Sequence, residues 1–112
     1  MQLPDEVTKY LEYVVQTIQL RLPISSIWLY GSYAKGTYNK HSDLDIFIVT
    51  PDKSKKRLEW MQEISGSIDR NWGLPLQIIV NYEDEFEERC RGIYTLEKEV
   101  IRTGVKIYEQ RG

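Results

Sequence analysis

The hydrophobic positions of the chain follow a helical rhythm at its beginning. Apolar residues recur at i, i+3, i+4 and i+7 and predict an amphipathic helix with these core positions: Val7, Tyr10, Leu11, Val14, Val15, Ile18 and Leu22. Asp5 and Glu6 stand near its start, where acids favour a helix, and Pro23 stops it. The next segment, ISSIWLY at 24–30, is short, β-branched and aromatic, so it predicts a strand that ends at Gly31.

Two further strands follow, separated by a second helical pattern. The segment LDIFIVT at 44–50 is apolar on both alternating faces after its first residues, which predicts a central strand covered from both sides. A helical face is then predicted by Leu58, Met61, Ile64 and Ile68, although Gly66 weakens its middle. The segment LPLQIIVNY at 74–82 predicts the third strand.

Shorter elements are predicted for the rest of the chain. The acidic segment EDEFEE predicts a short helix or turn, and VKIYE at 105–109 predicts a last, short edge strand. Between them Ile93, Leu96, Val100 and Ile101 stand at helical spacing before Gly104, a residue typical of helix ends. The pattern as a whole predicts one α/β (α+β) domain over residues 1–112, with a small mixed sheet flanked by helices.

Composition narrows the class of protein. The chain has 112 residues, 29% of them charged and 41% hydrophobic, which is typical of a single globular domain. A formal charge of −2 and a pI of about 5.4 argue against electrostatic binding of a nucleic-acid backbone over a broad surface. They allow one local pocket that binds a small anion. No apolar segment approaches the roughly 20 residues that span a bilayer, so we expect a cytoplasmic protein with no membrane partner.

Two aspartates mark the candidate site. Asp43 and Asp45 are spaced i and i+2, so on a strand both carboxylates project from one face, roughly 7 Å apart along the chain. Leu44 points the other way, and the pair stands at the rim of the core, where uncompensated negative charge is costly. A divalent cation resolves this conflict, and hard oxygen ligands suit Mg²⁺, which usually completes its coordination with water and substrate phosphates.

A glycine and a serine precede the aspartates and supply a candidate phosphate cradle. Gly31 and Ser32 follow the first strand and open a predicted short helix, so backbone amides and the Ser32 hydroxyl can meet an anion where Gly31 has no side chain. Lys35 adds a positive charge, and Gly36 is placed to end the turn. Tyr33 and Tyr38 flank this loop and are candidates for contact with a base or a partner.

These motifs resemble the nucleotidyltransferase superfamily that includes DNA polymerase beta, and within it the minimal nucleotidyltransferases of prokaryotes. The matching residues are Tyr30-Gly31-Ser32, Lys35-Gly36 and Ser42-Asp43-Leu44-Asp45-Ile46. The resemblance covers the whole chain in outline, because small members of the family also begin with a helix and end with a helix and a Gly-Val-x-apolar-Tyr segment, here 104–108. It implies the nucleotidyltransferase fold.

The resemblance also implies roles for the site residues. Gly31 and Ser32 would bind the triphosphate of an NTP, expected to be ATP, while Asp43 and Asp45 would hold Mg²⁺ for transfer of a nucleoside monophosphate to an acceptor hydroxyl. Lys35 stands where the family more often has arginine and supplies charge without a bidentate fork. Ser42 would orient or cap the turn beside the nucleotide.

Partners are implied in the same way. The catalytic fold accounts for almost all of the chain, which suggests that a partner protein supplies the acceptor group. Minimal nucleotidyltransferases often occur with a small all-helical HEPN protein, as the antitoxin of a toxin–antitoxin pair, and some adenylylate a tyrosine of that toxin. The nucleotide base, the acceptor, the number of metals and the oligomeric state are left open by the sequence.

One residue departs from the family pattern. Active members usually carry a third carboxylate on the next core strand, where this chain has Gln77, an amide that brings no negative charge and is a poor base. Asp69, Glu83 and Asp84 are alternative carboxylates, and the sequence gives no reason to choose among them. A second hypothesis therefore stays open: a catalytically impaired nucleotidyltransferase fold that acts by protein contact.

Overall fold

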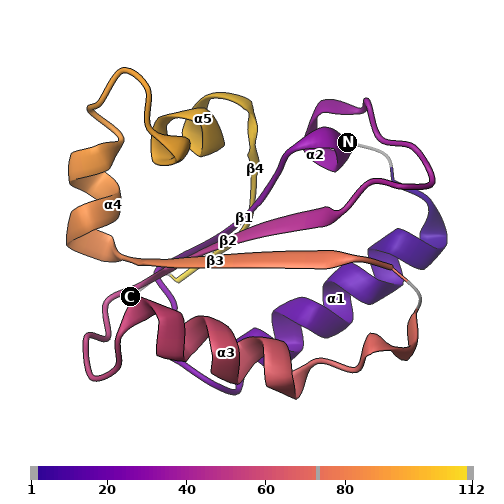
Figure 1. Cartoon of the computed structure of the whole chain (residues 1–112), viewed down its shortest axis with the longest axis horizontal. Coiled ribbons are helices and arrows are strands. Elements are labelled where there is room, and N and C mark those ends of the chain that lie inside the picture. The colour runs from indigo at the N-terminus through magenta and orange to yellow at the C-terminus, as the bar shows by residue number, and fades with distance from the viewer. Residues whose placement is uncertain (1–2, 73, 111–112) are drawn as a thin grey trace.

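The structure is a computed structural model that describes residues 3–72 and 74–110 (Figure 1). Its elements in chain order are α1 (Asp5–Gln19), β1 (Ser26–Tyr30), α2 (Ser32–Lys35), β2 (Leu44–Thr50), α3 (Arg57–Ser67), the 3₁₀ turn η1 (Arg70–Trp72), β3 (Leu76–Tyr82), α4 (Glu83–Arg89), α5 (Leu96–Thr103) and β4 (Val105–Glu109). The predicted order of helices and strands is confirmed, and EDEFEE forms a helix rather than a turn.

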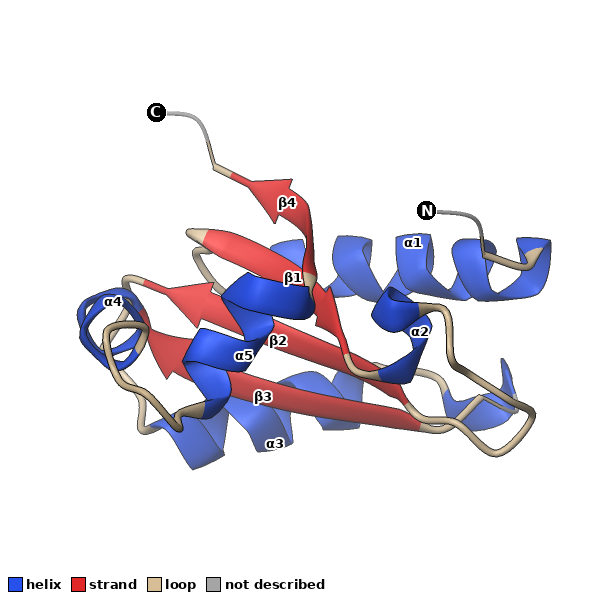
Figure 2. Cartoon of the chain, turned by 90° about the horizontal axis from the view of Figure 1, so that it is seen from above, coloured by secondary structure: helices blue, strands red, loops and turns tan. Residues whose placement is uncertain are grey.

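The four strands form one mixed sheet in the order β3-β2-β1-β4. β1 pairs antiparallel with both β2 and β4, whereas β2 and β3 run parallel, with the crossover through α3 (Figure 2). The register pairs Tyr30 with Asp45, and Asp45 in turn with Gln77. The end of β1 and the starts of β2 and β3 therefore meet at one corner of the sheet.

Helices cover both faces of the sheet, as the apolar central strand predicted. α1 and α3 lie on one face, where they pack with Leu44, Ile46 and Ile48 of β2. α4 and α5 lie on the other, where Phe47 and Val49 pack with Phe86 (Figure 1). Alternation along β2 places Asp45 on the α4/α5 face, at the open end of that layer.

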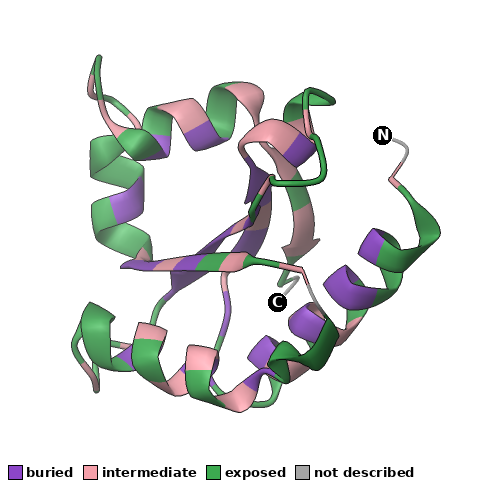
Figure 3. Cartoon of the chain, turned by 45° about the vertical axis from the view of Figure 1, so that its right-hand side comes forward, coloured by how far each residue is buried: buried purple, intermediate pink, exposed green. Residues whose placement is uncertain are grey.

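Several predicted core positions are wrong. Leu58 is 62% exposed because the residues of α3 that face the core are Trp60 and Ile64 instead. Ile93 is 81% exposed because α5 begins only at Leu96, after an N-cap at Thr95. The loop between α4 and α5 is largely exposed in Figure 3. Leu96 and Ile101 were also predicted to face the core, and each is more than a third exposed.

Gly104 ends α5 for a reason other than the expected one. Its backbone is extended, with φ −84° and ψ 172°, and does not adopt the left-handed conformation typical of a helix end. A Cβ at this position would lie 2.4 Å from the Val100 carbonyl oxygen and 3.0 Å from that of Leu29. Glycine is needed here so that the end of α5 can approach β1.

Candidate active site

The candidate site is built around a close contact between Gly31 and Asp45. Gly31 has φ 75° and ψ −155°, a backbone conformation that is essentially restricted to glycine. A Cβ on Gly31 would lie 2.2 Å from Asp45 Oδ2, so the carboxylate rests against the bare Cα. The residue predicted to open the phosphate cradle and one predicted metal ligand thus form a single site.

The electrostatics of this corner disfavour an isolated negative charge. Burial raises the pKa of the Asp45 carboxyl above its ordinary value, and the neighbouring Asp43 carboxylate raises it further. Tyr30 lies beside Asp45 in the register, and burial together with the Asp45 charge raises the pKa of its phenol to about 12. A cation bound here would relieve both effects, because it would favour the ionised carboxylates.

Gln77 occupies the neighbouring position on β3. It pairs with Asp45 in a parallel register, so both side chains project from the same face, and Gln77 is exposed. The alternative carboxylates lie elsewhere. Glu83 and Asp84 begin α4 at the opposite end of β3, and Asp69 lies beyond α3, where its Oδ1 accepts a hydrogen bond from a backbone N–H in η1.

The donor set of this corner fits a magnesium ion. It combines two carboxylates, from Asp43 and Asp45, with the amide of Gln77 beside them, all oxygen donors of the kind that Mg²⁺ accepts. Within residues 3–72 and 74–110, no group of three or more histidine, cysteine, aspartate or glutamate side chains converges on a metal position. A Mg²⁺ held here would therefore take much of its coordination from water and phosphate.

α2 is a single turn between two left-handed glycines, Gly31 and Gly36. Gly36 has φ 76° and ends the turn, as predicted, and a Cβ there would meet nothing within 4 Å. Ser32 is the first residue of the turn, where the leading amide groups have no intrahelical acceptors. Lys35 is the last residue of the turn. Its Nζ lies 3.4 Å from Glu99 Oε1 on α5, so the two side chains form an ion pair.

Glu99 is a neighbour of the site that sequence reasoning missed. Its second oxygen accepts a hydrogen bond of 2.7 Å from Arg102, so the carboxylate holds two cations at the junction of α2 and α5. These interactions lower the pKa of Glu99, the hydrogen bond from Arg102 most of all. The sequence offered only the i, i+3 spacing of Glu99 and Arg102, with no sign that Lys35 would join them.

The loop before Asp43 is held by local hydrogen bonds. The Ser42 hydroxyl accepts a hydrogen bond of 2.9 Å from the Asn39 N–H, and the Asn39 side chain accepts one of 2.8 Å from the His41 N–H. Ser42 therefore orients the turn that precedes Asp43 and Asp45.

The two tyrosines of the loop differ in exposure. Tyr33 is only 5% exposed and stacks on Tyr38, with the ring centroids 4.6 Å apart and an interplanar angle of 14°. The prediction that Tyr33 contacts a base or partner is wrong, because the ring packs in the core. Tyr38 is half-buried and keeps one part of its surface accessible.

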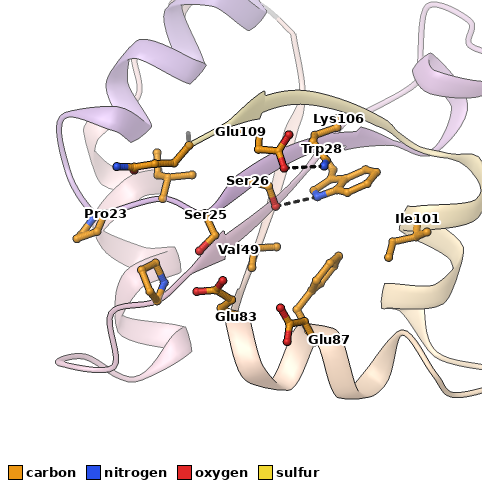
Figure 4. A pocket seen from close by; sticks show the side chains of 14 residues that line it. Pro23, Ser25, Ser26, Trp28, Val49, Glu83, Glu87, Ile101, Lys106 and Glu109 are labelled. Carbon is orange, nitrogen blue, oxygen red and sulfur yellow. Dashed lines mark hydrogen bonds and ion pairs between the residues drawn. The ribbon is translucent and has the colours of Figure 1, made fainter. Parts of the chain in front are cut away.

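A run of basic residues at 53–57 lies away from this corner. Within the basic run at 53–57, Lys53 pairs with Asp84 and Lys55 lies 3.0 Å from Glu63. None of the described helices has the length and apolar character needed to cross a membrane. A groove lined by Trp28, Phe86 and other residues lies at the opposite end of the α4/α5 face (Figure 4).

Comparison with known proteins agrees with this geometry. A family model described as a nucleotidyltransferase domain matches residues 9–106, so the chain belongs to that family. "Probable protein adenylyltransferase MntA" of Haemophilus influenzae is 30% identical over 95 residues, which cover 80% of this chain and 81% of the relative. Within the family, the chain is a minimal nucleotidyltransferase (MNT), and the resemblance seen in its motifs is confirmed.

Solved structures confirm the nucleotidyltransferase fold. A toxin–antitoxin crystal structure with AMP-PNP contains a chain that is 19% identical, with a TM-score of 0.60 over 96% of this chain and 76% of that one. The structure of a tri-AMPylated Shewanella oneidensis HEPN toxin in complex with MNT antitoxin contains one that is 16% identical, with a TM-score of 0.55 over 92% and 72% of the two chains.

Proposed function

We propose that the chain transfers AMP from ATP to a hydroxyl group of a partner protein, with Mg²⁺ held by Asp43 and Asp45. The contact between Gly31 and Asp45 carries this proposal, because it joins the phosphate cradle and the metal ligands in one site. The name of the Haemophilus influenzae relative and the AMP-PNP and AMPylated toxin in the structural neighbours support the choice of AMP and of a protein acceptor.

The expected partner is a small helical HEPN-type protein, with this chain as the antitoxin of the pair. An MNT antitoxin bound to an AMPylated HEPN toxin is among its structural neighbours, which supports this choice. The partner itself would then present the acceptor hydroxyl.

Each side chain of the site has a part in the reaction. The acceptor oxygen forms a bond to the α-phosphorus of ATP and gives up its proton to solvent water. The bond from that phosphorus to the bridging oxygen breaks, and pyrophosphate leaves with the electron pair. Gly31 and Ser32 bind the leaving phosphates through backbone N–H groups and the serine hydroxyl, and Lys35 adds positive charge. Ser42 keeps the aspartates in place. Bound Mg²⁺ supplies charge neutralisation and alignment of the phosphates.

Gln77 favours a second candidate function. The position beside Asp45 that could offer a base to the acceptor holds a neutral amide, which cannot accept a proton at neutral pH. A chain that binds nucleotide weakly or turns it over slowly could still neutralise its partner by contact. This alternative differs from the first in one respect that can be measured, the transfer of label from ATP to the partner.

Calorimetric titration of ATP, with and without Mg²⁺, tests the nucleotide site. We expect binding that needs Mg²⁺ and is lost in the Asp43→Asn, Asp45→Asn double variant, whose near-isosteric amides keep the size of the side chains but remove their charges. Label from α-³²P-ATP should then pass to a co-expressed HEPN-type partner. Strong Mg²⁺-dependent binding without transfer would favour the contact-only function, and binding that is unchanged in the double variant would refute the site.

A further inference from the structure

A groove of about 600 Å³ lies on the α4/α5 face, at the end remote from Gly31 and Asp45 (Figure 4). It is bordered by the start of β1, the end of β2, α4 and β4. Aromatic and aliphatic side chains line it: the ring centroids of Trp28 and Phe86 are 6.3 Å apart, and Ile101 is 46% exposed at its edge. The proposed transfer reaction makes no use of this hollow.

Two like charges face the groove from α4. Glu83 and Glu87 are spaced i, i+4, both line the groove, and both side chains extend toward it in Figure 4. Carboxylates at this spacing repel each other. Among the described residues neither has an ion-pair partner, whereas Asp84 on the same helix pairs with Lys53. The groove therefore combines an apolar floor with two carboxylates that form no ion pair with any described residue.

The chain itself shows how a cation is accommodated beside this floor. Lys106 of β4 lies over the Trp28 ring, with Nζ 5.3 Å from the centroid, and its Nζ is also 3.1 Å from Glu109 Oε1. Both residues line the groove. An aromatic face and a carboxylate thus share one positive charge on the β4 side. The α4 side offers the exposed carboxylates of Glu83 and Glu87, which have no ion-pair partner among the described residues.

We propose that this groove docks a segment of a protein partner that carries an arginine, with its guanidinium between Glu83 and Glu87 and its aliphatic stem on the apolar floor of the groove. Arginine fits better than lysine because it is planar, weakly hydrated, able to contact two carboxylates and able to stack on aromatic rings. Trp28, the groove residue of β1 closest in sequence to the site, stands three residues before Gly31, about 10 Å along the strand. A partner held in the groove would leave its own acceptor free to reach the nucleotide.

The test uses the intact chain and three synthetic peptides, and needs no nucleotide, so its failure would leave the transfer proposal standing. The peptides are acetyl-Ala-Leu-X-Leu-Ala-amide with arginine, lysine or neutral citrulline at X. In ¹H–¹⁵N spectra we expect the arginine peptide to shift the Trp28 Nε1–H signal and the backbone signals of Glu83 and Glu87. Lysine should bind several-fold more weakly, and citrulline should cause no shift.

Matched variants separate a specific groove from general attraction to an acidic protein. Glu87→Gln should weaken binding of the arginine peptide about fivefold or more, while Glu88→Gln, which removes the same charge from the exposed side of α4, should leave it unchanged. Equal weakening by the two variants, or equal binding of the citrulline peptide, would overturn the proposal. Changes in the Trp28 signal on dilution of the protein alone would assign the groove to a second copy and would also overturn it.

Discussion

Replacing Gly31 with alanine should damage the candidate site far more than the same change at Gly36. At Gly31 the backbone conformation is one that only glycine adopts readily, and holding alanine there costs about 1–3 kcal/mol. The new Cβ would also lie 2.2 Å from Asp45 Oδ2 and 3.1 Å from its Cγ. Because these are side-chain atoms, the carboxylate would rotate away, and we expect affinity for Mg²⁺-ATP to fall by about 10–100-fold.

Gly36→Ala is the matched control. Its φ of 76° is nearly that of Gly31, and left-handed alanine costs roughly 1–2 kcal/mol, but no atom lies within 4 Å of the new Cβ. Both variants should lower Tm, by about 4 °C per kcal/mol for a domain of this size, and circular dichroism would show the extent. Only Gly31→Ala should lose Mg²⁺-ATP binding in calorimetry. Wild-type affinity in Gly31→Ala would refute the idea that Asp45 must rest on a bare Cα.

Three further substitutions test other contacts. Gln77→Asp should raise Mg²⁺ affinity and the rate of label transfer about tenfold or more, as radiolabel assays would show, and an unchanged rate would argue that the third position has no catalytic role. Glu99→Gln should free Lys35 for phosphate and tighten ATP binding about two- to fivefold in calorimetry, while weaker binding would mean that Glu99 only supports α2. Glu97→Gln should cost about 1–2 kcal/mol in urea unfolding at pH 7, because the Glu97 carboxylate is buried and accepts hydrogen bonds from Arg89 and Asn81. Burial would raise the pKa of Glu97, but those hydrogen bonds outweigh the effect of burial and hold the pKa below 4.5. The stability that the Glu97 carboxylate provides is therefore present above that pH and is lost as the pH falls through the folded pKa. The difference between Glu97→Gln and wild type should therefore shrink in acid, and a difference that stays constant until the protein unfolds in acid would contradict this assignment.

Much of the fold follows from periodicity. The apolar stripe of α1 and the two-sided hydrophobicity of β2 each have one reasonable structural solution, and the structure adopts it. The stripe predicted for the last helix is only partly confirmed: Val100 is buried, but a charged residue takes the rest of the buried face. Glu97 is 4% exposed there. Its burial is tolerated only because Arg89 of α4 and Asn81 of β3 donate hydrogen bonds to its carboxylate.

The candidate site was predictable where its residues are close in sequence and less so where they are not. Gly31 and the aspartates belong to one local motif, and their spacing was enough to place them together. The position of Gln77 depended on the register between β2 and β3, which a single sequence does not determine. The link between Lys35 and Glu99 crosses more than half of the chain and depends on the packing of α5 against β1.

The pairing of β1 with β4 has a consequence for synthesis of the protein. β1 lies near the N-terminal end of the sequence and β4 near the C-terminal end, yet they are neighbours in the sheet. While the ribosome is still adding the residues between them, one edge of β1 is open and its backbone groups can pair with another nascent chain. The motif that carries Gly31 and the aspartates is synthesised long before the strand that closes this edge of the sheet, so β1 stays open to mispairing until β4 has emerged from the ribosome.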